Sequence, residues 1–247
     1  MFYHENRDAM TGMTGPPLWI SPEDLERATV SCLTRVFQRM FIALLITAAS
    51  AYAAFAIPAL YLLVYDVPFV LYGVIIAELV LVIVVAACIN KLSPTVANIL
   101  FFTYAAINGL TLSFVFYTFN IGIVFHAFAI TALMFAGMAL YGAITRRSLA
   151  SIGSICLMGL FGIIIASAVN FFFRSELVEA IVSYVGVLIF VGLTAYDTQR
   201  IKVMLSNACA ADHTEAIKKI SIVGALSLYL DFINLFLKIL RIVGRRR

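Results

Sequence analysis

The stretch GLTAYDTQRIK, Gly192–Lys202, places Asp197 at the end of an apolar run of the kind that crosses a membrane. The rest of the chain is similarly apolar: 63% of its 247 residues are hydrophobic, 12% are charged, and the mean hydropathy is +1.04. A water-soluble domain cannot expose so much apolar surface. The composition therefore predicts an integral membrane protein whose first partner is the lipid bilayer.

A membrane-spanning helix needs about 20 apolar residues. Seven runs of this length are present, and we predict a transmembrane helix at each: 37–62, 69–89, 97–118, 121–144, 150–173, 180–200 and 220–240. The connections are mostly short, so consecutive helices should pack as antiparallel neighbours. The fold class is all-α, with a polar arm at 1–35, one seven-helix domain at 36–241 and a basic tail at 242–247.

Prolines mark several predicted helix ends, because proline cannot donate a helical hydrogen bond. Pro58 should kink or end the first helix, and Pro68 and Pro94 should begin the second and third. The longest polar connection is expected at 201–219, although TQRIKVML has helical propensity and the sixth helix can continue to about Leu205.

The basic residues predict a cytoplasmic N-terminus, because loops rich in Lys and Arg stay in the cytoplasm. With that orientation the cytoplasmic side collects Arg27, Arg35, Arg39, Lys91, Arg146, Arg147, Arg200, Lys202, Lys218 and Lys219. The opposite loops before the seventh helix hold only Arg174. The basic tail breaks the pattern, so either the last helix is central or re-entrant, or one run is not a full crossing.

The net charge of +4 lies mainly in short loops and in the tail, where it suits anionic lipid headgroups rather than nucleic acid. The cysteines, Cys32, Cys88, Cys156 and Cys209, are single and widely spaced, and we interpret them as packing residues. His126 is expected at a membrane interface. No metalloenzyme spacing or phosphate-binding loop is present, so we predict no cofactor and no enzyme.

Three carboxylates lie within apolar runs, where a charge is costly and usually functional: Glu78, Asp197 and Asp231. Asp231 is about eleven residues into its run, roughly 16 Å from the cytoplasmic end. If the sixth helix continues to Leu205, Asp197 reaches a comparable depth and the two aspartates can meet. Such a pair shares a proton and senses pH, and its ionised form offers hard oxygens that suit calcium.

Each acid also has a structural interpretation. Asp197 can pair with Arg200 at a helix end, and Asp231 can accept a hydrogen bond from Ser227, Asn234 or a neighbouring helix. Glu78 can be protonated or can pair with a basic residue such as Arg241.

The segments AYDTQ and LYLDFINLF, with INKLSP and NGLTLS earlier in the chain, resemble the Bax-inhibitor-type (transmembrane Bax inhibitor motif) family. The resemblance covers nearly the whole chain and implies a bacterial inner-membrane protein with a central C-terminal helix. It also implies a pH-sensitive calcium leak with calcium as the transported ion. Asp197 and Asp231 would be the hydrogen-bonded sensor and gate, and the calcium site.

Bacterial relatives can carry an arginine in the second helix that latches one aspartate. This chain offers only Lys91 there, and lysine lacks the bidentate fork of arginine. Glu78, Arg200 and Arg241 are the other candidates for the ion pathway or latch.

Two other functions remain open. Paired membrane aspartates also build intramembrane aspartyl proteases, but here the second aspartate lies in LYLD rather than in a GxGD context, and no PAL segment follows it. The chain could instead restrain a membrane protease or a cell-death protein through its N-terminal arm or its tail.

Overall fold

The computed structural model describes residues 21–66 and 68–245, which form helices and short connections without a β-strand. The helices are α1 Pro22–Ala56, α2 Pro58–Tyr65, α3 Pro68–Ala87, α4 Pro94–Leu112, α5 Phe114–Thr118, α6 Ile121–Ile144, α7 Ala150–Phe173, α8 Glu176–Ala210 and α9 Thr214–Gly244. Among these residues, seven helices or helix pairs are long and apolar enough to cross a membrane. The predicted fold class is confirmed.

The predicted proline boundaries are confirmed: Pro58, Pro68 and Pro94 each begin a helix, and α1 ends at Ala56. Serine caps strengthen three helix starts, since the hydroxyls of Ser21, Ser93 and Ser175 accept hydrogen bonds from the amides of Asp24, Val96 and Val178. These side chains satisfy backbone amides that have no partner within the helix.

Three predictions about the helices are wrong. The first helix, predicted to begin at residue 37, begins at Pro22. The run at 97–118 is interrupted at Ser113, whose hydroxyl and amide both bond the Leu110 carbonyl and tighten the turn there. The long connection expected at 201–219 is only 211–213, because α8 continues to Ala210 and α9 begins at Thr214. Its extension is held by buried apolar side chains such as Leu205.

Several predicted ends lie close to the edge of the described residues. Residues 22–35 of the arm predicted at 1–35 belong to α1, so the predicted end of the arm at 35 is wrong, and residues 1–20 lie outside the described residues. The tail predicted at 242–247 overlaps the end of α9, and residues 246–247 also lie outside them.

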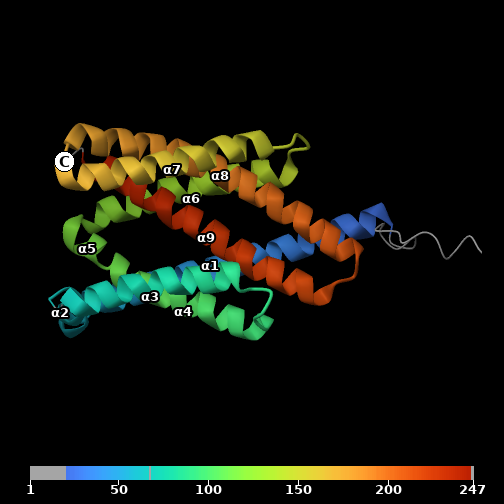
Figure 1. Ribbon diagram of the computed structural model, residues 1–247, viewed down its shortest axis with the longest axis horizontal. Helices are drawn as coiled ribbons and strands as arrows, with labels where there is room; N and C mark the ends of the chain where they lie inside the picture. The colour runs from blue at the N-terminus through green and yellow to red at the C-terminus, as the bar shows by residue number, and fades with distance from the viewer. Residues whose placement is uncertain (1–20, 67, 246–247) are drawn as a thin grey trace, which may run out of the picture.

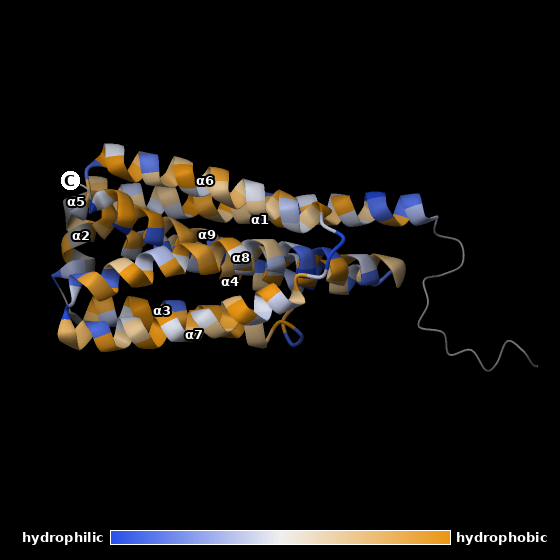
Figure 2. Cartoon of the chain, turned by 90° about the horizontal axis from the view of Figure 1, so that it is seen from above, coloured by the Kyte–Doolittle hydropathy of each residue, from blue (hydrophilic) through white to orange (hydrophobic). Residues whose placement is uncertain are grey.

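The C-terminal helix occupies the centre of the bundle, as predicted. α9 packs against α1, α4, α6 and α8, and 67% of its apolar window is buried, compared with 6% for α3 and 11% for α7. Figure 1 shows α9 passing between these neighbours, with α3 and α7 on the outside. In Figure 2 apolar residues dominate the outer helices, as expected of a surface that faces lipid.

The helices are of unequal length, and the excess projects from one end. We call this the N-terminal end: it holds the start of α1 and the connections at 88–93, 145–149 and 211–213. At about 1.5 Å per residue, the 35 residues of α1 and of α8 span roughly 52 Å, against about 30 Å of hydrocarbon. Figure 1 shows α1, α8 and α9 extending beyond the other helices there. The C-terminus lies at the opposite end, which we call the C-terminal end.

Candidate functional site

The central hairpin of α8 and α9 sets the register of the acidic residues. Its connection, 211–213, is centred on Asp212, so Asp197, fifteen residues before it, lies opposite Ser227, fifteen residues after it. The Ser227 hydroxyl donates a hydrogen bond to Oδ2 of Asp197. This contact joins the two helices inside the bundle.

Asp231 lies one helical turn further along α9, on the same face as Ser227. Its side chain is buried, with 6% of its surface exposed, and it lies within electrostatic range of the Asp197 carboxyl. Its Oδ2 has no hydrogen-bond partner among the described residues. A buried polar oxygen without a partner is costly, which makes it a functional candidate.

Neither Ser227 nor Asn234 donates the hydrogen bond to Oδ2 of Asp231 that the sequence allowed. Ser227 bonds Asp197, and the Asn234 amide donates to the Leu230 carbonyl at 2.9 Å. The neighbouring Phe232 ring packs edge-on against Phe135 of α6. The Asp231 carboxyl therefore lies in apolar surroundings within electrostatic range of Asp197, but the expected hydrogen bond between the two aspartates is absent among the described residues.

Glu78 belongs to a second polar cluster, on the other side of α9. It accepts a hydrogen bond from Thr111 and also contacts the Asn108 amide, both on α4. The Tyr229 hydroxyl donates to Asn108 at 3.0 Å and shares a hydrogen bond with Thr47 of α1 at 2.7 Å. This cluster ties α1, α3, α4 and α9 together at membrane depth.

Of the two structural alternatives for Glu78, the pairing with Arg241 is not found. Arg241 is exposed in the last turn of α9, at the C-terminal end, whereas Glu78 is in the middle of α3 with Thr111 as its partner. Because a threonine hydroxyl on the next helix already faces the carboxyl, no basic residue is needed there.

The other candidate cations differ in their distance from the aspartates. Arg200 lies one turn from Asp197 on α8, but no ion pair joins the two among the residues that the structure describes. Lys91 is exposed in the connection after α3, which is tied to the start of α9 by a hydrogen bond from Lys219 to the Asn90 carbonyl. That point is twelve residues before Asp231, or roughly 18 Å along the helix. No ion pair joins Lys91 to either aspartate within 21–66 and 68–245.

Comparison with known proteins covers nearly the whole chain. Residues 29–247 match the family model described as "Inhibitor of apoptosis-promoting Bax1". The chain belongs to the Bax inhibitor-1 family. The inner membrane protein YbhL of Escherichia coli is 46% identical over 215 residues, which are 87% of this chain and 92% of YbhL.

Other Bax inhibitor-1 relatives come from distant bacteria. An uncharacterised protein of Borreliella burgdorferi is 42% identical over 87% of this chain and 92% of its own length. One of Rickettsia prowazekii is 37% identical over 87% of this chain and 89% of its own length. With the seven apolar helices, these relatives establish an integral membrane protein.

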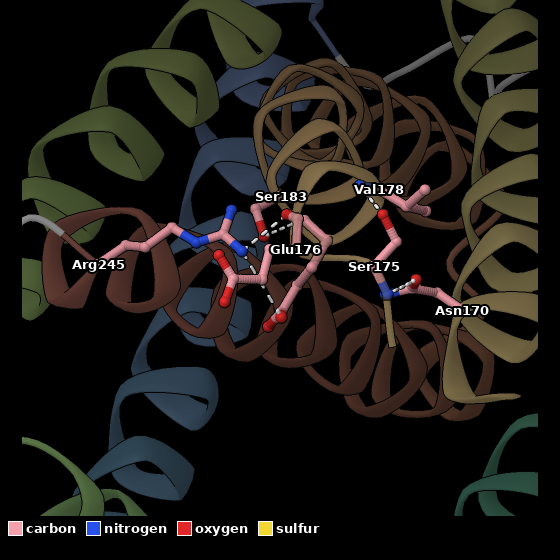
Figure 3. Close-up of polar contacts among 7 residues, drawn as sticks. Asn170, Ser175, Glu176, Val178, Ser183 and Arg245 are labelled. Atoms are coloured by element: carbon pink, nitrogen blue, oxygen red, sulfur yellow. Dashed lines mark hydrogen bonds and ion pairs between the residues drawn. The ribbon is translucent and has the colours of Figure 1, made fainter. Parts of the chain in front are cut away.

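At the C-terminal end of the bundle of this Bax inhibitor-1 protein, a contact that the sequence did not predict joins the end of α9 to the start of α8. The Arg245 guanidinium donates to the Glu176 carbonyl at 2.7 Å and lies 3.8 Å from the Glu179 carboxylate (Figure 3). Figure 3 also shows Asn170 accepting from the Ser175 amide, where α7 turns into α8. The end of α9 is thereby tied to the first turn of α8.

His126 lies away from the aspartates. It lines a groove of about 750 Å³ between α6, α8 and α9 near the C-terminal end, and its Nδ1 lies 2.6 Å from the Gly122 carbonyl of its own helix. The groove is lined mainly by apolar side chains, including Ile130, Leu188 and Ile242. This arrangement suits lipid contact better than proton transfer.

Proposed function

We propose that this Bax inhibitor-1 family protein is a pH-sensitive calcium leak channel, gated by Asp197 and Asp231. The carrying observation is the buried Asp231 carboxyl, which has an unpartnered oxygen and lies within electrostatic range of Asp197 on the adjacent helix. Two such groups in a dry site titrate as one unit. The protonation of the pair can therefore bias the packing of α8 against α9.

The gate follows from the charge of the pair. When one proton is shared, the carboxyl groups attract one another, and Ser227 holds the helices together through Asp197. When both are ionised, like charges face each other in a low-dielectric interior and favour separation or a bound cation. Each change is local, but α9 contacts α1, α4, α6 and α8, so its displacement reaches the whole bundle.

Calcium fits this chemistry as a transported ion. Ca²⁺ takes six to eight oxygen ligands, and two carboxylates with the Ser227 hydroxyl supply only part of that set. No cluster of three or more His, Cys, Asp or Glu suited to a metal occurs among the residues that the structure describes. Water and backbone carbonyls would complete the shell, giving the weak binding that a permeating ion requires.

The test is calcium flux into proteoliposomes across a pH series. Asp197→Asn and Asp231→Asn each remove one titrating group while keeping the side-chain shape, so both should flatten the pH response. The matched control is Asp66→Asn, which changes an exposed aspartate at the end of α2 and should leave the response as in the wild type. Unchanged flux and pH response in both site variants would remove the pair from the mechanism.

A second function is favoured by the family description, "Inhibitor of apoptosis-promoting Bax1", which names a protein target. In that case the chain restrains a membrane protease or a cell-death protein, and ion flux is incidental. Deleting the N-terminal arm or the basic tail should then abolish the cellular phenotype while flux in proteoliposomes persists. The aspartate variants would retain the phenotype.

We propose that the two aspartates are not the catalytic pair of an intramembrane protease, and the variants Asp197→Asn and Asp231→Asn also test this claim. An intramembrane protease would cleave a model transmembrane substrate, and either Asp→Asn change would abolish the cleavage.

A further inference from the structure

Two of the four cysteines meet at the N-terminal end of the bundle. Sγ of Cys32, on α1, lies 3.8 Å from Sγ of Cys209, on α8, although 177 residues separate them in the chain. Both are free thiols. The sequence predicted only that the cysteines pack, and nothing in their spacing indicated that these two face each other.

The pair lies where water can reach it. Cys209 is the penultimate residue of α8, next to the connection that carries the exposed Asp212 and His213. Cys32 is buried, with 9% of its surface exposed, whereas Cys209 is partly exposed. A small oxidant can therefore reach Cys209 first, and Cys32 is positioned to react second.

We propose that Cys32 and Cys209 are a redox modification site, which a peroxide oxidises to a reversible disulfide between α1 and α8. The Cys209 thiol loses its proton as its sulfur attacks a peroxide oxygen, the O–O bond breaks, and the departing hydroxide takes up that proton, which gives a sulfenic acid and one water. The Cys32 thiol then attacks the sulfenic sulfur, and a second water leaves. Overall, two thiols lose two protons and two electrons, and one peroxide becomes two waters.

The two sulfur atoms need to move only a short distance to form the disulfide. A disulfide bond is about 2.05 Å long, so the sulfur atoms must approach by less than 2 Å, which side-chain rotation and a small helix shift can supply. Cys88 lies in the connection after α3, and Cys156 lies on α7 where its sulfur packs against Gly192. The reaction should therefore select one pair among the four thiols.

The cross-link would act on the same helix as the proposed gate. α8 carries both Cys209 and Asp197, and joining α8 to α1 restrains its movement within the bundle. A covalent link between residues so far apart in sequence also restricts the unfolded chain. The oxidised protein should therefore unfold at a higher temperature, whether or not it conducts calcium.

The experiment maps disulfides in the full-length protein in detergent after treatment with hydrogen peroxide, blocking of free thiols with N-ethylmaleimide and digestion with trypsin. Cleavage after Arg27, Arg35, Lys202 and Lys218 places the two cysteines in peptides 28–35 and 203–218, each with a single cysteine. We expect these peptides to be joined under non-reducing conditions and released by dithiothreitol. The unfolding temperature should rise with the joined fraction.

Variants separate this pair from a general reaction of thiols. Cys32→Ser and Cys209→Ser should each abolish the linked peptides and the rise in unfolding temperature, whereas Cys88→Ser should preserve both. Recovery of both wild-type cysteines as maleimide adducts after peroxide treatment would overturn the proposal. A disulfide that uses Cys88 or Cys156 instead would also overturn it. The mapping needs no variant, so a poorly folding serine variant leaves it intact.

Discussion

Ser227 is the side chain that connects the acidic site to the helix hairpin. Its hydroxyl donates to Asp197 from the position directly opposite on α9, while Asp231 follows one turn later. A hydrogen bond to an ionised acceptor is worth about 1.5–3 kcal/mol, roughly twice a neutral one. The charge on Asp197 is thus supported by a donor, whereas Oδ2 of Asp231 has none among the described residues. The two carboxyl groups are unequal before any proton moves.

Removing this donor should move the pH response of the channel. In Ser227→Ala the ionised form of Asp197 loses its hydrogen bond, so a higher pH is needed to remove its proton. The pH at half-maximal change in calcium flux should rise by about one unit, since 1.36 kcal/mol corresponds to one unit. The measurement is flux in proteoliposomes from pH 5 to 9.

Ser221→Ala is the matched control for this prediction. Ser221 is buried on the same helix, but its hydroxyl bonds the Ile217 carbonyl of its own backbone at 2.7 Å. Its removal should leave the midpoint unchanged. Equal shifts in the two variants, or no shift in Ser227→Ala, would show that the Ser227 hydroxyl does not support the charge on Asp197.

At the scale of the helices, close approach of α6 and α8 positions Asp197. A methyl group at Gly142 would lie 2.2 Å from the Ala195 carbonyl oxygen, which is backbone and cannot rotate away. Ala195 is two residues from Asp197. A side chain at 142 must therefore push the helices apart next to the acidic site, as expected where small residues allow membrane helices to pack closely.

Gly142→Ala should lower the unfolding temperature and disturb calcium flux, because it separates α6 from α8 and so loses packing. The better helix propensity of alanine, about 1 kcal/mol, should not compensate for this loss. Gly137→Ala on the same helix is the matched control, since nothing lies within 4 Å of its added methyl group. It should be neutral or stabilising. Thermal unfolding in detergent measures both, and equal stability of the two variants would contradict the close packing at Gly142.

Much of the helical architecture could be predicted from the sequence, because apolar length and proline position are local signals. The seven spans and the starts at Pro58, Pro68 and Pro94 follow directly from them. The continuation of α8 to Ala210 was missed in part because polar residues at 206–212 look like a loop, although buried Leu205 and Ala208 hold the helix. The break at Ser113 depends on one hydroxyl bonding its own backbone, which composition does not reveal.

The candidate site could be predicted only as far as its acidic residues. Asp197 and Asp231 stand out because carboxylates are rare in apolar runs, and the expected hairpin brings them to adjacent helices. Their partners depend on helix register, so the donation by Ser227 to Asp197 could be located only after the three-residue connection was known. The contact of Thr111 with Glu78 crosses between α3 and α4 and has no signature in the sequence.

For the whole molecule, the two ends of the bundle differ in how their charges are matched. At the N-terminal end, two of the three connections carry basic residues, Lys91 in 88–93 and Arg146 and Arg147 in 145–149. At the C-terminal end, Arg245 lies on the first turn of α8 beside Glu179, and it also bonds the Glu176 carbonyl. The basic end of α9 therefore faces acidic residues rather than a second set of basic loops. With the N-terminus in the cytoplasm as predicted, this pairing and the central position of α9 would account for a basic helix end on the side that the charge rule disfavours.

Seven crossings would put the two ends of the bundle on opposite sides of the membrane, and the basic loops lead us to expect the N-terminal end in the cytoplasm. The side of each position can be measured by labelling single cysteines in intact cells with a membrane-impermeant maleimide. The native cysteines are first replaced by serine, and the new cysteines are Ser148→Cys, Arg174→Cys and Arg247→Cys. Arg174→Cys and Arg247→Cys should be labelled, because seven crossings put both on the outer side, while Ser148→Cys should react only after permeabilisation. Labelling of Ser148→Cys alone would reverse the orientation but keep seven crossings. If Arg247→Cys were protected together with Ser148→Cys, α9 would not cross the membrane. The proposal that the α8–α9 hairpin carries both aspartates to membrane depth would then be contradicted.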